Sequence, residues 1–211
     1  MSIIAVPQAI SAVAAEGSFK IRRAQGALTT VAGVSQVTTF SDRRWRAQVR
    51  VKPRSGANLR LWSLFMTQLS DIENVFALAP PHYDGPSTGY AGAGPLVAGA
   101  DQLGLALDVD TLGLSAAVLL KGDFISFDVT SPGGDTNRQL IQVAADVTSD
   151  GAGAVTIALT TPIRQAPANN AAVEIFSPTA LFSFETPEGG VEIDTNLMSE
   201  FIMDVIERIF P

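Results

Sequence analysis

The sequence predicts a mainly β fold: a β-sandwich domain with one α-helix, interrupted by an inserted small β-barrel of the OB type. Three observations support this class. One segment alternates apolar and basic residues with the period of a strand. One segment repeats apolar residues with helical spacing. The second half carries short apolar runs about every eight to twelve residues, separated by Gly, Pro and Asp turns. The predicted limits are residues 1–83 plus 179–211 for the sandwich and 84–178 for the barrel.

The alternating segment is the clearest predicted strand, and it ends at Pro53. Apolar residues on one face alternate with polar ones on the other, where the basic residues are Arg44, Arg46, Arg50 and Lys52. Two further strands are predicted before it, at residues 19–22 and 27–40, the second with Gly33 as a turn or bulge. Ser41 and Asp42 then predict a turn.

A helix is predicted after this strand, with Ser55 as its N-cap. Leu61, Leu64, Phe65 and Leu69 recur every three or four residues, so this helix should lie on a sheet by its apolar stripe. Residues 74–78 predict a short strand. The stretch 84–100 is rich in Gly and Pro and predicts an irregular loop.

Beyond the loop, turn residues separate the short strands of the expected barrel. The turn at 149–153 should join two of them as a hairpin. Residues 200–210 fit both helical and strand spacing. The expected strands after residue 100 are 103–109, 118–120, 124–129, 139–143, 145–148, 154–159, 173–176, 181–185 and 191–194.

Charge is distributed unevenly along the chain. Residues 1–60 hold ten basic and two acidic residues, a charge of +8, whereas residues 61–211 hold four basic and nineteen acidic residues, a charge of −15. Such asymmetry indicates nucleic-acid binding, two solvated faces, or contact between the basic surface of one copy and the acidic surface of another. Basic residues alternate with apolar ones instead of forming a run, so nucleic-acid binding is the least favoured.

The residues that usually carry catalysis are scarce. The chain has no cysteine, which excludes disulfides and thiolate chemistry, and its one histidine, His82, lies among prolines without a serine-hydrolase motif. Asp108 and Asp110 would share one face of a strand, but each acidic residue here, including Asp123, also fits a turn or a solvated face. We therefore predict no enzyme, no catalytic residue, no cofactor and no metal site.

Nothing in the sequence predicts membrane insertion. The apolar run at residues 1–15 is interrupted by Pro7 and is shorter than a bilayer span requires. It superficially resembles a signal peptide, yet the first basic residue is Lys20, so we do not expect export by this route.

Three segments resemble the distal tail proteins of long-tailed bacteriophages and related tail-like particles. Residues 37–69 are similar to that family's Arg-Trp strand, proline stop and amphipathic helix, and a strand at 75–78 follows. Residues 119–127 are similar to its Gly-Asp strand start. Residues 142–163 resemble its Asp-Gly-x-Gly hairpin and Pro-ended strand.

The resemblance implies an architectural role in the virion tail tip, or baseplate, after synthesis in the host cytoplasm. A ring of six copies would join the tail tube protein to the hub or fibre proteins and leave a channel through which DNA passes. The discontinuous domain would be the ring-forming belt, with a strand at the C-terminus. A ring requires a head-to-tail interface, and Arg44, Arg46, Arg50 and Lys52 are its candidate residues. An acidic inner wall would let DNA pass without binding.

Three alternatives stay open from sequence alone. The chain could be a tube or hub subunit of the same assembly. The small barrel could bind a host glycan, with Tyr90 as its main loop aromatic and Tyr83 at the edge. A carboxylate hydrolase that uses Asp108 and Asp110 is the least favoured.

Overall fold

The computed structural model describes residues 2–7, 14–29, 35–51, 56–69, 74–81, 83–131, 133–185, 191–193 and 199–209. The chain divides into two compact units. We call Ala77–Leu181 the central unit, and Ser2–Phe76 with Phe182–Arg208 the split unit. The fold is mainly β, with one helix in the described part and several antiparallel sheets. This confirms the predicted class at that level.

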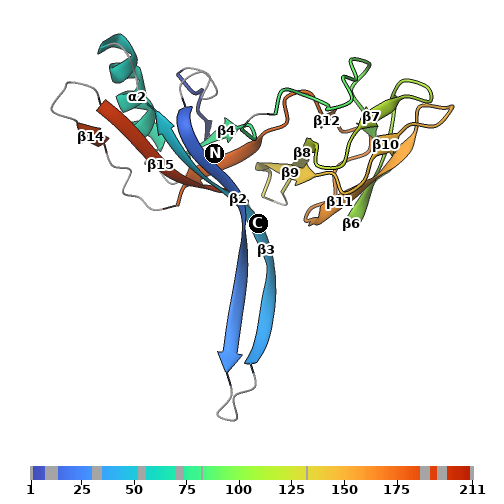
Figure 1. Ribbon diagram of the computed structural model, residues 1–211, viewed down its shortest axis with the longest axis horizontal. Helices are drawn as coiled ribbons and strands as arrows, with labels where there is room; N and C mark the ends of the chain where they lie inside the picture. The colour runs from blue at the N-terminus through green and yellow to red at the C-terminus, as the bar shows by residue number, and fades with distance from the viewer. Residues whose placement is uncertain are drawn as a thin grey trace. The chain divides into compact units, whose positions relative to one another are not determined.

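A seven-stranded sheet organises the split unit, in the order β1-β4-β13-β15-β3-β2, with β14 also paired to β15 (Figure 1). Its strands differ greatly in length: β2 and β3 have 16 and 17 residues, whereas β1 has two. Their bounds are β1 Ser2–Ile3, β2 Ala14–Thr29, β3 Ser35–Val51, β4 Asn74–Leu78, β13 Ala180–Phe184, β14 Val191–Ile193 and β15 Ser199–Glu207.

The single described helix, α2 (Gly56–Leu69), buries Trp62, Phe65, Met66 and Leu69, which recur at helical spacing. The predicted helix is therefore confirmed, but Leu61 and Leu64 of its predicted apolar stripe are 49% and 55% exposed, and Trp62 and Met66 are buried in their place. Its proposed N-cap, Ser55, lies outside the described residues. No helix in the part of the chain that the structure describes has the length and apolar character of a membrane span.

Aromatic rings connect α2 to the sheet. Phe65 meets Phe76 of β4 edge-on at a centroid distance of 5.5 Å, and Phe76 lies 6.3 Å from Phe182 of β13. Phe19 of β2 lies 6.1 Å from Phe182 and stacks on Trp45 of β3 at 4.7 Å. Each fully buried aromatic side chain of this kind contributes about 1.5–3 kcal/mol by leaving water. This series of aromatic contacts therefore stabilises the core side of the sheet at β3.

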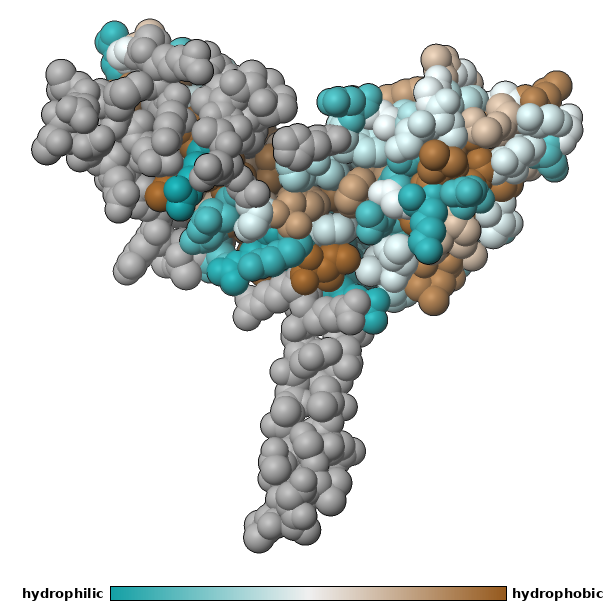
Figure 2. Space-filling model, in the orientation of Figure 1, coloured by the Kyte–Doolittle hydropathy of each residue, from teal (hydrophilic) through white to brown (hydrophobic). Residues whose placement is uncertain are grey.

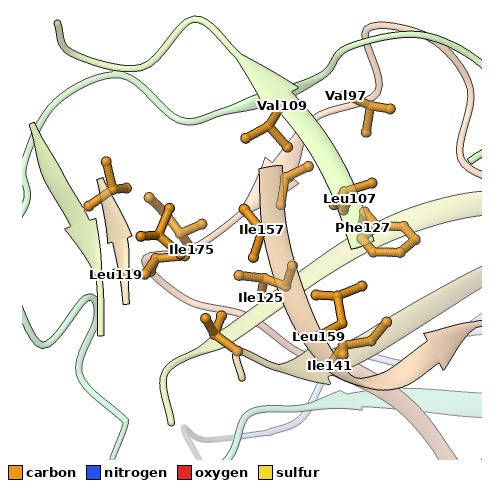
Figure 3. Packing of buried hydrophobic residues seen from close by; sticks show 14 of the residues in the cluster. Val97, Leu107, Val109, Leu119, Ile125, Phe127, Ile141, Ile157, Leu159 and Ile175 are labelled. Atoms are coloured by element: carbon orange, nitrogen blue, oxygen red, sulfur yellow. The ribbon is translucent and has the colours of Figure 1, made fainter. Parts of the chain in front are cut away.

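Three small antiparallel sheets form the central unit: β7 with β10, β5-β6-β11, and β9-β8-β12. They enclose one apolar cluster, in which Leu107, Ile125, Phe127 and Ile157 point toward one another (Figure 3). No closed barrel is identified among the described residues. The bounds are β5 Leu96–Val97, β6 Gly104–Asp110, β7 Ala117–Leu119, β8 Phe124–Thr130, β9 Thr136–Gln142, β10 Val147–Thr148, β11 Val155–Ile163 and β12 Val173–Glu174.

Not every apolar residue of the central unit is buried. Brown patches on its visible surface in Figure 2 show that hydrophobic residues reach solvent there. Leu103, Leu105 and Leu114 are 63%, 57% and 70% exposed. Exposed leucines of this kind are common on soluble proteins and do not by themselves indicate a binding surface.

Two local predictions are wrong. The turn expected at Ser41 and Asp42 is absent, since β3 runs through both residues, and the register of β3 with β2 shifts there between the pairs Arg23–Arg43 and Gln25–Thr39. The extra residues of β3 at this register shift form a bulge-like irregularity in the ladder where the turn was expected. The expected strand at 27–40 is instead the end of β2 and the start of β3, and Gly33 between them lies outside the described residues.

The second wrong prediction is the hairpin around residues 149–153. That turn joins β10 to β11, but β10 pairs with β7 and β11 pairs with β6. The Asp150 carboxylate accepts hydrogen bonds from the backbone N–H groups of Ala152 and Ala154, both at 2.8 Å. Backbone hydrogen bonds from Asp150 N–H to Ala154 O at 2.9 Å and from Gly153 N–H to Asp150 O at 3.2 Å close the same turn, so it stays tight although the flanking strands enter different sheets.

Candidate interaction face

The predicted basic strand is confirmed as part of β3. Trp45, Ala47, Val49 and Val51 are all at most 8% exposed, whereas the residues between them are partly exposed. The structure thereby places Arg44, Arg46 and Arg50 on one face of β3, opposite the core. Lys52, the fourth predicted residue, lies outside the described residues.

Neighbouring strands extend this face on both sides. Arg46 lies between Lys20 of β2 and Ile206 of β15, and Arg50 lies beside Ile202 of β15. Lys20 is exposed, and the two isoleucines are partly exposed. Directly opposed residues of paired strands share a face. We call this set the basic face; its members are Lys20, Arg44, Arg46, Gln48, Arg50, Ile202, Asp204 and Ile206.

Two carboxylates already lie at the basic face. Arg46 forms an ion pair with Glu185, and their side chains are 37% and 15% exposed. Gln48 donates from Nε2 to Oδ1 of Asp204 at 3.0 Å. Partly exposed pairs of this kind contribute at most about 1 kcal/mol. The sequence reasoning missed both acidic residues, because they reach β3 only through the pairing of β15.

The core side of β3 is held at the point where β15 stops pairing with it. The last pair of that ladder is Arg46 with Ile206. Beyond it, the fully buried carboxylate of Glu207 accepts a hydrogen bond from the backbone N–H of Trp45 at 3.0 Å. The Glu207 side chain therefore supplies the acceptor that a paired strand would otherwise give to the Trp45 N–H. This hydrogen bond keeps Arg44 and Arg46 in strand geometry.

Two of the acidic residues considered for catalysis, Asp108 and Asp123, have structural partners. Asp108 accepts a hydrogen bond from the Thr156 hydroxyl. The buried Asp123 accepts from the Leu120 N–H at 2.8 Å and from Ser87. Asp110 shares the side of β6 that holds Asp108 but is less exposed. Within the described residues, no cluster of three or more acidic residues or histidines could hold a metal ion.

A bidentate pair ties β8 to β9. Arg138 donates from Nε and Nη2 to the two carboxylate oxygens of Asp128, at 2.6 and 2.9 Å. These hydrogen bonds raise the pKa of Arg138 above its ordinary value, so its guanidinium stays charged. The pair connects opposed residues of the two strands and has the geometry of a structural clamp.

The loop tyrosines considered for glycan binding are also engaged in the fold. The Tyr83 hydroxyl donates to the Ile175 carbonyl at 3.1 Å, and burial raises the pKa of Tyr83, with the Asp123 charge adding to the shift. The Tyr90 hydroxyl donates to Ala93 O and accepts from Gly113 N–H. Both hydroxyls thus stabilise the loop. His82 lies outside the described residues.

Comparison with known proteins does not assign this chain to a family. No protein-family model matches the sequence, and no curated protein matches it at a significant level.

Proposed function

We propose that this protein is a structural subunit of a bacteriophage tail tip, of the distal tail protein type. Six copies close a ring that joins the tail tube to the hub or fibre proteins and leaves a channel for DNA. In this proposal the split unit is the β-sandwich belt that forms the ring. The three sheets of the central unit correspond to the inserted OB-like barrel.

The observation that carries the proposal is the basic face on an otherwise acidic chain. Three arginines and a lysine share this face with two partly exposed isoleucines. Residues 61–211 carry a charge of −15, of which only Glu185 and Asp204 are placed at the basic face. A ring closes only if each copy offers two different, complementary surfaces. Opposite charges on two parts of one chain provide such a pair.

Apolar burial must supply most of the binding free energy. Each exposed ion pair contributes at most about 1 kcal/mol, whereas apolar burial contributes about 25 cal/mol per Å². Ile202 and Ile206 lie among the basic residues and are partly exposed. The charges would then select the partner and its register, and the isoleucines would provide the affinity.

Charge reversal tests this proposal. The double variant Arg44→Glu, Arg50→Glu should shift the protein from a ring to a monomer in native mass spectrometry. Arg60→Glu is the matched control, because Arg60 is an exposed arginine on α2 and is not part of the basic face. Wild-type protein that is monomeric both alone and with its tail-tube partner would refute the proposal.

A further inference from the structure

The first half of β6 has one unpaired edge. β5 pairs with β6 only at its last two residues, Val109 and Asp110. Next to them the Gln102 side chain takes the place of a strand, because its Oε1 accepts from the Asp108 N–H at 2.6 Å and its Nε2 donates to the Asp108 carbonyl at 3.1 Å. In the described part of the chain, no strand pairs with residues 104–107 on this side. The sheet therefore ends there in an open edge.

Ala106 presents its backbone groups at this edge. It lies opposite Ala158 of β11, whose carbonyl accepts a hydrogen bond from the Ala144 N–H at 2.8 Å and not from β6. Ala106 and Ala158 are therefore a pair without hydrogen bonds to each other, so the N–H and C=O of Ala106 point away from β11. Ala106 is exposed. Both backbone groups are thus available to an added strand.

The side chains along this edge are apolar. Leu107 and Val109 belong to the apolar cluster (Figure 3), and Leu105 continues their side of β6 past the cluster, where it is 57% exposed. Leu103, just before the strand, is 63% exposed. Residues 102–107 contain no charge and no proline, the residues that commonly protect an edge from other strands. Open backbone groups beside exposed apolar side chains are the features with which a sheet binds an extended peptide.

Charge selects the kind of peptide. Residues 85–120 contain three charged residues, all of them aspartates: Asp101, Asp108 and Asp110. Asp101 and Asp108 are exposed, and Oδ1 of Asp110 has no hydrogen-bond partner among the described residues. Asp108 and Asp110 lie on the face of β6 opposite Leu105. Because paired strands share their faces, the segment that fits has apolar side chains on one face and Lys or Arg on the other.

We propose that the open edge of β6 binds an extended segment of another protein in which apolar residues alternate with Lys or Arg. The segment exchanges backbone hydrogen bonds with Ala106, covers Leu105, and places its cations beside Asp108. This inference goes beyond the proposed self-assembly, because it gives the central unit a binding role that does not involve the basic face.

A synthetic peptide tests the inference on the full chain. The probe alternates Ile or Val with Lys, and the control peptide has Glu in place of each Lys. In NMR titrations the Lys peptide should shift the Ala106 amide and the methyl groups of Leu103 and Leu105, with a Kd of about 1 mM or tighter. The Glu peptide should bind about tenfold more weakly or worse. Absence of these shifts, or equal binding of the two peptides, overturns the inference.

Two variants locate the site. Ala106→Pro removes the edge N–H, which is outside the ladder with β11, so the melting temperature should change little while peptide binding falls about tenfold or more. Asp101→Asn covers the case in which the proline variant does not fold, because Asn tolerates the φ of 59° there while the charge is lost. Its binding should weaken about threefold. Asp84→Asn, at an exposed aspartate outside this edge, should bind as wild type does. Unchanged binding in either folded edge variant overturns the inference.

Protein concentration distinguishes a foreign segment from a second copy of this chain. Without peptide, the Ala106 amide should exchange with solvent at the same rate at low and at high protein concentration. Protection that rises with concentration alone would show that a second copy occupies the edge, which overturns this inference and leaves the proposed function standing. A wild type that stays monomeric but binds the Lys peptide refutes only the proposed function.

Discussion

The two units of this molecule use polar residues in opposite ways. In the central unit, Asp108, Asp123, Asp128 and Asp150 each accept hydrogen bonds from the unit's own chain, and one apolar cluster lies between the sheets. In the split unit, Lys20 is exposed beside the arginines of β3. The first pattern stabilises a fold, while the second leaves Lys20 exposed on the face where we propose that a partner binds. Variants of such residues in the central unit should therefore show their main defect in stability, and variants of the basic face should show theirs in self-association.

The largest expected effect is on the stability of the central unit. Phe127 is 2% exposed and lies in the apolar cluster, so Phe127→Ala should lower the free energy of unfolding by about 3–5 kcal/mol. Urea denaturation followed by fluorescence measures this loss. The fraction that remains folded should still self-associate, because the basic face is unchanged. Loss of self-association in fully folded Phe127→Ala protein would contradict the conclusion that the central unit stabilises the fold and the split unit mediates assembly.

A smaller loss is expected at the turn between β10 and β11. Gly153 has a φ of 79°, and a Cβ there would collide with the carbonyl oxygen of Leu112. Gly153→Ala should therefore cost about 2 kcal/mol, from backbone strain and displacement of Leu112. Gly151→Ala is the control in the same turn, since a Cβ at Gly151 meets nothing within 4 Å. Equal melting temperatures for the two variants would disprove this account.

Glu207 tests the split unit, where stability and assembly should change together. Glu207→Leu leaves the buried N–H of Trp45 without its acceptor, which costs about 1–2 kcal/mol. Glu207→Gln keeps an oxygen acceptor and should lose less. Because Trp45 separates Arg44 from Arg46, the leucine variant should also weaken self-association. Sedimentation at a temperature where both variants are folded separates the loss of self-association from the loss of stability. Unchanged self-association of the leucine variant would show that the Glu207 hydrogen bond does not support assembly.

Alternation in the sequence was sufficient to predict the basic strand. Trp45, Ala47, Val49 and Val51 face the core and the arginines face away, because a strand has a period of two. The strand predicted at 74–78 is confirmed as β4 for the same local reason. Local pattern thus predicts which face of a strand is buried.

Long-range pairing was beyond the reach of sequence. The apolar residues of 200–210 fit both the helical and the strand period. Pairing with β3, β13 and β14 makes β15 a strand, with Met203 and Val205 buried and Ile202 partly exposed. The same pairing places Asp204 against Gln48, 156 positions earlier in the chain. The local spacing of charges does not encode such a contact. The acidic residues of the basic face were therefore unpredictable.

The smallest expected effect is a pH dependence confined to the central unit. Hydrogen bonds from the backbone N–H groups of Ala154 and Ala152 lower the pKa of Asp150. A carboxylate with a lowered pKa in the folded state stabilises the fold above its unfolded pKa of about 3.9, and this contribution is lost as pH falls through the folded pKa. The melting temperature of wild type should exceed that of Asp150→Asn at pH 7, and the gap should close toward pH 3. Asp84→Asn, at an exposed aspartate, controls for the change in net charge. A gap that stays constant across this pH range would show that the carboxylate charge does not stabilise the turn.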